Sequence, residues 1–174
     1  MAVMPIVCVP HKALAGKAKE IKNIDEVLLT LAHDMAETMY KAPGIGLAAN
    51  QVGKLLQLVV VDVEYACADP AEKKKQPIFL INPVICECEG ENVLEEACLS
   101  VPDFNVEIVR PACVHIRAVD LDGNELNIDA DGLLARALQH EIDHLHGTTI
   151  LEHASVLKRN LYKRKLKKQA RRDA

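Results

Sequence analysis

Apolar residues recur with helical spacing in the first quarter of the chain. The residues concerned are Val27, Leu28, Leu31, Met35 and Met39. Positions three or four apart lie on the same face of a helix, so these side chains would form one apolar face. Asn23 or Asp25 is a suitable N-cap, and Pro43 interrupts the pattern soon after it ends. The pattern therefore predicts a helix that runs to about Tyr40.

Runs of β-branched and apolar residues predict strands in the middle of the chain. These runs are residues 55–63, 77–85, 112–121 and 125–128. The last two flank Asp122-Gly123, a dipeptide typical of tight hairpin turns, so we expect them to pair. The polar segment 64–76 contains three consecutive lysines and is expected to form an exposed loop.

Two more helices are predicted in the last third of the chain. The first begins at Asp129 or Asp131 and ends at Gly147, because glycine suits the left-handed conformation that often follows a helix. The second spans residues 154–169. No internal repeat and no linker-like segment interrupts the sequence. The pattern therefore favours one α+β domain that includes residues 1–174.

The charges are unevenly distributed. The chain holds 21 basic and 25 acidic residues, yet nine basic residues and only one acidic residue lie from Lys158 onward. This separation favours a polyanionic partner at the basic end. No apolar run approaches the roughly 20 residues of a membrane-spanning helix, and Met1–Pro10 lacks the features of a secretory signal. We therefore expect a cytoplasmic protein without a membrane partner.

The pentapeptide His140-Glu141-Ile142-Asp143-His144 falls inside the helix predicted to end at Gly147. Its two histidines are four residues apart, so both imidazoles lie on one face and can converge on one metal ion. Glu141 follows directly and can act as a general base on a water molecule at the metal without being a ligand. The sequence therefore predicts a metal centre on this helix.

A catalytic site of this kind needs a third protein ligand and one open position. Metzincin-type proteases take it from a histidine ten residues after the first, but this position holds Ile150. Glu152 is too close to the second histidine to replace the distant glutamate of other metalloproteases. The third ligand should therefore lie upstream, where a cysteine, His115 or an acidic residue are all open. The six cysteines do not suggest disulfides, so a reduced thiol is available.

Two further segments stand in a fixed order before this helix. These two segments are GIGLAANQ at residues 44–51 and EEACLSVP at residues 95–102. The helix itself carries the third, QHEIDHLHG, at residues 139–147. In this order, the three segments resemble the signature motifs of the peptide deformylase family, and the resemblance covers nearly the whole chain. It implies mainly antiparallel β-sheets around a central metal-binding helix, with a basic C-terminal helix from about residue 154.

The resemblance implies that the protein removes the formyl group from the N-terminal formyl-methionine of newly synthesised polypeptides and releases formate. Cys98 would be the third metal ligand beside the two histidines, and Glu141 the general acid and base. The side-chain amide of Gln51 and the backbone N–H of Leu99 would donate to the developing oxyanion. The resemblance favours one Fe(II) ion per chain in the cell, although zinc, nickel and cobalt also suit two imidazoles and one thiolate.

The resemblance also suggests how a formylated nascent peptide binds. The pocket for its methionine side chain would draw on Ile45, Gly46, Leu94, Leu133 and Ala137. The basic C-terminal helix would dock on the ribosome, and no binding of a specific DNA sequence is expected. Arg110 is interpreted either as an anchor for the peptide or as an ordinary surface residue.

One position departs from the family pattern. Glycine is common in the family where this chain has Ala97, and alanine would cost about 1 kcal/mol if this residue needed a positive φ. Two other functions compete with deformylation, namely cleavage of internal peptide bonds and a non-catalytic metal protein associated with the ribosome. The presence of Glu141 and Gln51 argues against the second, because neither is needed merely to hold an ion.

Overall fold

The computed structural model describes residues 2–67 and 74–171. Its helices are the 3-10 helices η1 (Lys12–Ala15) and η2 (Ala49–Val52), and the α-helices α1 (Glu26–Lys41), α2 (Val63–Cys67), α3 (Gly132–Leu145), α4 (Ile150–His153) and α5 (Val156–Ala170). Its strands are β1 (Gly46–Ala48), β2 (Leu58–Val61), β3 (Ile78–Glu89), β4 (Asn92–Cys98), β5 (Val101–Arg110), β6 (Cys113–Val119) and β7 (Glu125–Asp131). The predicted α+β class is confirmed.

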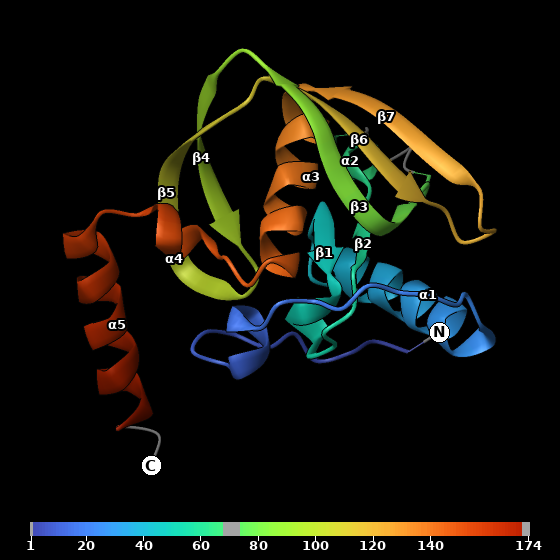
Figure 1. The fold of residues 1–174 in the computed structure, drawn as a ribbon. Helices are drawn as coiled ribbons and strands as arrows, with labels where there is room; N and C mark the ends of the chain where they lie inside the picture. The colour runs from blue at the N-terminus through green and yellow to red at the C-terminus, as the bar shows by residue number, and fades with distance from the viewer. Residues whose placement is uncertain (1, 68–73, 172–174) are drawn as a thin grey trace.

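The strands form two separate antiparallel sheets. A five-stranded sheet has the order β1-β2-β3-β6-β7, and β4 pairs only with β5 in a two-stranded hairpin. The predicted β6–β7 hairpin is confirmed: Val119 pairs with Glu125, and Gly123 in the turn has a φ of +86°. The hairpin of β4 and β5 was not among the predicted strands. Figure 1 shows α3 in the centre of the molecule, between this hairpin and strands β3, β6 and β7.

The first predicted helix is confirmed as α1, with Asp25 as its N-cap. The Asp25 carboxylate accepts a hydrogen bond of 2.9 Å from the backbone N–H of Leu28. The prediction that Val27 belongs to the apolar face is wrong, because this side chain is 77% exposed. Ala32 and Ala36 lie on the buried face instead. The small side chains of Ala32 and Ala36 let α1 pack closely against β1 and β2, as the lower part of Figure 1 shows.

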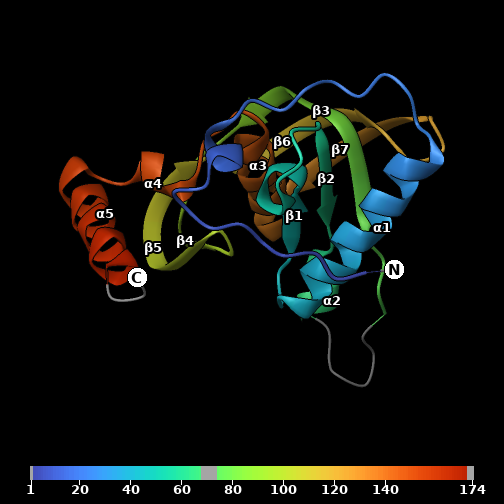
Figure 2. The same cartoon turned by 90° about the horizontal axis from the view of Figure 1, so that it is seen from below.

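The helix predicted over residues 154–169 is confirmed as α5, and a short helix that was not predicted comes before it. The short helix α4 precedes α5, and Ser155 caps α5 by accepting a hydrogen bond from the backbone N–H of Lys158. Tyr162 anchors α5 to the β4–β5 hairpin: its ring packs on Phe104, and its hydroxyl donates to the carbonyl of Pro102 at 2.7 Å. In both Figure 1 and Figure 2, α5 lies on the side of the hairpin away from the larger sheet.

The segment 64–76, expected to be a loop, begins as the helix α2, and residues 68–73 of that prediction lie outside the described residues. None of the helices in the described ranges is both long enough and apolar enough to cross a membrane.

Candidate metal centre

Helix α3 places two histidines and a glutamate at the centre of the molecule. It begins after Asp131 and ends before Gly147, as predicted, and Gly147 has a φ of +78°. A side chain at Gly147 would meet the carbonyl oxygen of Ala15 at 2.7 Å, so the close approach of η1 also requires glycine here. The rings of His140 and His144 lie on one face with their centroids 5.0 Å apart.

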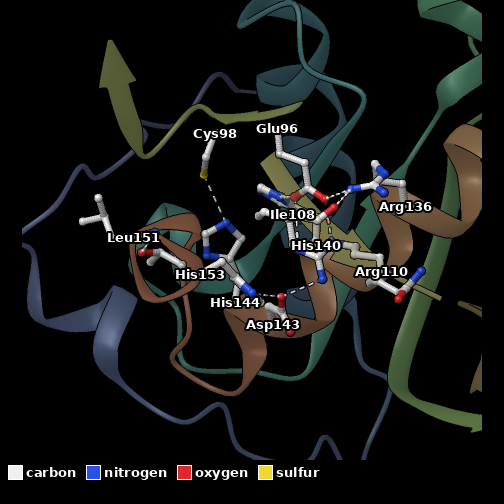
Figure 3. Close-up of polar contacts among 12 residues, drawn as sticks. Glu96, Cys98, Ile108, Arg110, Arg136, His140, Asp143, His144, Leu151 and His153 are labelled. Carbon is white, nitrogen blue, oxygen red and sulfur yellow. Dashed lines mark hydrogen bonds and ion pairs between the residues drawn. The ribbon is translucent and has the colours of Figure 1, made fainter. Parts of the chain in front are cut away.

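The third donor comes from the β4–β5 hairpin. Cys98 ends β4 at an irregularity in the strand register, and its Sγ lies 3.2 Å from Nε2 of His144 (Figure 3). Donor atoms of Cys98, His140 and His144 all lie within 4.8 Å of one another. His115, which the sequence left open as a ligand, lies on the outer face of β6 and is hydrogen-bonded to Asp129. Among the three possibilities, the geometry therefore favours the cysteine.

These three donors fit a transition metal ion. Bond lengths of about 2.0–2.1 Å to nitrogen and 2.3 Å to sulfur place tetrahedral ligand atoms roughly 3.5 Å apart. Here Sγ of Cys98 lies 3.2 Å from Nε2 of His144, and all three donor atoms lie within 4.8 Å of one another. Burial lowers the pKa of His144 to about 3, which favours the neutral imidazole that a metal ligand must be. Two imidazoles and a thiolate suit zinc, iron(II), nickel or cobalt rather than magnesium or calcium.

Glu96, which the residue patterns did not single out, orients one of the histidines. Its Oε2 lies 2.9 Å from Nδ1 of His140, which leaves Nε2 of that ring to face Cys98 and His144 (Figure 3). Such a carboxylate fixes the tautomer and orientation of a ligating imidazole. Burial alone would raise the pKa of Glu96, but hydrogen bonds from His140 and Arg110 outweigh it and lower the pKa to about 2. Glu96 is therefore a carboxylate at neutral pH.

Arg110 is neither a surface residue nor placed to hold a peptide, so both interpretations from the sequence are wrong. Its side chain is 6% exposed and forms a bidentate pair with Glu96, at 2.6 and 3.1 Å. A third bond of 2.9 Å joins it to Asp143, which also contacts His153 at 3.1 Å. The alternating pattern of β5 places Arg110 on the same buried face as Ile108. A buried arginine requires a carboxylate partner, so this pattern was a usable signal.

Glu141 lies in a cavity of about 400 Å³ beside the metal ligands. Its side chain is buried, and burial raises its pKa to about 7. A carboxyl group with this pKa can both accept and donate a proton near neutral pH. The backbone of Gly46 passes directly over it, since a Cβ on Gly46 would be 2.6 Å from Oε1 of Glu141. Glycine at this position therefore makes the space that the carboxylate occupies.

Gln51 also faces the cavity, in a fixed orientation. Its Oε1 accepts a hydrogen bond of 2.8 Å from the backbone N–H of Ala48, so its Nε2 is turned towards Cys98, with Sγ at 3.7 Å. Leu99 follows the cysteine and lines the same cavity. Gln51 from η2 and Leu99 from the β4–β5 turn thus both border the cavity.

The cavity contains most of the predicted pocket residues. Ile45, Gly46, Leu133 and Ala137 line it, and Leu133 is 41% exposed there instead of lying in the core with the rest of its helix face. Leu94 on β4 is not one of the lining residues and is 45% exposed. The structure therefore does not support Leu94 as part of the pocket.

Ala97 lines the cavity without backbone strain. Among the described residues, Asn82 and Asp103 are the non-glycine residues with positive φ, and Ala97 is not one of them. Its expected penalty for a left-handed conformation therefore does not arise. The methyl group instead changes the shape of the cavity wall next to Cys98.

The chain matches the model of one protein family, described as polypeptide deformylase, over residues 3–160. The peptide deformylase of Syntrophobacter fumaroxidans is 47% identical over 169 residues, which cover 97% of this chain and 96% of that protein. The crystal structure of a peptide deformylase from Legionella pneumophila has a TM-score of 0.88 and 41% identity, with 99% of this chain and 98% of that chain covered. A structure of peptide deformylase from Ehrlichia chaffeensis in complex with actinonin has a TM-score of 0.88 and 40% identity, with 97% and 98% covered.

Proposed function

The chain belongs to the polypeptide deformylase family, and we propose that its central cavity hydrolyses the formyl group from the N-terminal formyl-methionine of newly synthesised polypeptides. The observation that carries this proposal is the convergence of Cys98, His140 and His144 beside Glu141 in one cavity. Because the ligands come from both the hairpin and α3, we further propose that residues 1–174 act as one catalytic domain.

We propose that Cys98, His140 and His144 hold one divalent ion, Fe(II) in the cell, with zinc, nickel or cobalt as substitutes. When bound, such an ion lowers the pKa of water and polarises a carbonyl oxygen. The protein contributes the orientation of its ligands. Glu96 orients the His140 ring through Nδ1, and Cys98 lies at the end of β4, where the strand register is irregular.

Glu141 moves the proton in this proposal. It accepts a proton from the water that attacks the formyl carbon and returns it to the amine nitrogen when the carbon–nitrogen bond breaks, so that formate and a free α-amine result. Its pKa of about 7 supports both directions of transfer. A positioned acid or base of this kind typically contributes about 10² to 10⁴ in rate.

Gln51 and Leu99 would stabilise the charge that develops on the formyl oxygen. The bond from Ala48 to Oε1 of Gln51 holds the amide nitrogen in place before the substrate arrives, and such preorganised donors are the effective ones. One donor of this type is typically worth about 3–4 kcal/mol in the transition state. The apolar wall of Ile45, Leu133 and Ala137 would receive the methionine side chain.

Formate release from a formyl-Met tripeptide tests this proposal, with anaerobic iron-loaded protein and nickel-loaded protein as an air-stable control. We expect rapid formate release and no cleavage of the internal bonds of the same peptide. Cleavage of internal bonds would favour the protease. If both the unmodified chain and Glu141→Ala bind metal but release neither formate nor internal fragments, the result would favour the non-catalytic metal protein.

We also propose a cytoplasmic location and a contact with the ribosome through the basic helix α5. The helix is tied to the hairpin by Tyr162, while its lysines and arginines are mostly exposed, as phosphate contacts without sequence preference require. Deletion of residues 166–174 should weaken co-sedimentation with ribosomes in a salt-dependent way, with the largest difference from the full chain at low salt, where phosphate contacts contribute most. Unchanged co-sedimentation of the shortened chain would rule out this contact.

A further inference from the structure

The metal site joins two parts of the molecule that share little apolar contact. The buried face of the β4–β5 hairpin packs against α4 and α5, in a cluster that includes Phe104, Val106, Ile150 and Tyr162. The buried face of α3 packs instead against the five-stranded sheet. Cys98 therefore belongs to one apolar cluster, while the two histidines extend from a helix of another. Polar contacts must set how the hairpin and α3 are aligned.

Arg136 makes the largest set of these polar contacts. Its side chain is 7% exposed and lies one helical turn before His140, on the same face of α3. The guanidinium donates to Oε1 of Glu96 at 2.6 Å, to the carbonyl of Ile108 at 3.2 Å and to the carbonyl of Asn92 at 2.8 Å. These acceptors lie on both strands of the hairpin, one on β5 and two on β4. Figure 3 shows Arg136 and His140 approaching Glu96 from the same helix.

This arrangement constrains the hairpin in a way that a single charge does not. A guanidinium is planar, and its donors have fixed directions. The three acceptors can all be satisfied only at one position of the hairpin relative to α3, and a buried donor left unsatisfied would cost free energy. Glu96 is two residues from Cys98 and on the same face of β4, so a shift at one displaces the other.

We propose that Arg136 is a positioning residue that holds the β4–β5 hairpin, and with it Cys98, in register with His140 and His144. Arg136 also lines the cavity, but its hydrogen bonds go to Glu96 and to two carbonyls of the hairpin rather than to the three metal ligands. Its effect is expected on the integrity of the three-ligand site, and through it on the reaction. The inference rests on the proposed metal site but not on the identity of the substrate.

The test compares Arg136→Met and Arg136→Lys with the unmodified chain in cobalt(II)-loaded, full-length protein. Two quantities are measured: the absorption band of the cobalt–thiolate bond, and the rate at which an excess of chelator removes the cobalt. Outer-shell changes typically weaken metal binding about 10- to 100-fold, so Arg136→Met should release cobalt at least about tenfold faster, with a weaker thiolate band. Arg136→Lys keeps the positive charge but loses the fixed donor directions of the guanidinium, so its rate of cobalt release should be intermediate.

Tyr162→Phe is the matched control. It removes another hydrogen bond to a hairpin carbonyl, the part-buried one to Pro102, but from α5 rather than α3. Cobalt release should then stay within about twofold of the unmodified rate, because Glu96 keeps all its partners. Equal rates and equal thiolate bands in Arg136→Met and the unmodified protein would overturn the proposal.

Arg136→Met should fold, because Glu96 keeps Arg110 and His140 as partners. If it does not, Arg136→Lys decides: faster cobalt loss supports the proposal, and an unchanged rate refutes it. An unmodified protein that binds cobalt through its thiolate but releases no formate would instead refute the proposed function and leave this inference intact.

Discussion

Alanine in place of Gly46 should displace the proposed general base without disturbing the backbone. Gly46 is in the extended strand β1 and is not among the glycines with positive φ, so alanine can adopt its conformation. The new Cβ would lie 2.6 Å from Oε1, 2.9 Å from Cγ and 3.0 Å from Cδ of Glu141. Carbon atoms in contact are normally about 3.5–4.0 Å apart, so the carboxylate must move by roughly 1 Å.

The size of the effect follows from this shift. A displacement of about 1 Å in a catalytic group can reduce the rate about 100-fold, which is close to 3 kcal/mol of transition-state stabilisation. Glu141 is buried and cannot turn freely into solvent to avoid the methyl group. We therefore expect kcat/KM for formate release to fall about 100-fold in Gly46→Ala. The metal content should stay unchanged because no ligand is touched.

The assay measures formate release and bound nickel in parallel samples. Gly44→Ala is the comparison variant: its Cβ would meet the end of the Leu99 side chain at 2.9 Å, and a flexible side chain can move aside. Its loss of activity should be clearly smaller than that of Gly46→Ala. If Gly46→Ala keeps its nickel and stays within about threefold of the unmodified kcat/KM, the inferred role of Gly46 in making space for the base is wrong.

Three other changes test the fold. Asp25→Ala removes the cap of α1 and should cost about 1 kcal/mol in denaturant unfolding, whereas an unchanged midpoint would contradict the cap. Met39→Ala empties a fully buried site and should cost about 2–5 kcal/mol in the same experiment, and a loss below 1 kcal/mol would argue against tight packing there. The hydrogen bond to Asp129 raises the pKa of His115, so its stabilising effect is present below about pH 6.5 and lost as pH rises through the raised value. NMR titration should show a lower His115 pKa in Asp129→Asn, and an equal pKa would refute the pairing.

Local signals were sufficient to predict the helices and turns whose positions depend on adjacent residues. Asp25 and the helical spacing predicted α1, and Asp122-Gly123 predicted the β6–β7 turn, because a cap or a turn depends on adjacent residues. The hairpin of β4 and β5 was missed. In β4, exposed apolar residues and two adjacent glutamates obscure the alternation, although β5 alternates clearly between buried and exposed positions.

The site was predictable where one motif held all the information. His140, Glu141 and His144 needed only the helical period, whereas Cys98 rested on the resemblance to a family. The carboxylate behind His140 could not be identified from the pattern, because Glu96 is 44 residues away and is brought there by the packing of the hairpin on α3. The pattern also could not show which residues of β4 reach the cavity, where Glu95 and Ala97 line it and Leu94 does not.

Metal content and formate release, measured together for two variants, test the central claim most directly. Glu141→Gln should keep the nickel but lose formate release by at least about 100-fold, because the base is not a ligand. Cys98→Ala should lose both, because it removes one of three ligands from the opposite side of the site. Full formate release by either variant would contradict a site in which the hairpin supplies a ligand and α3 supplies the base.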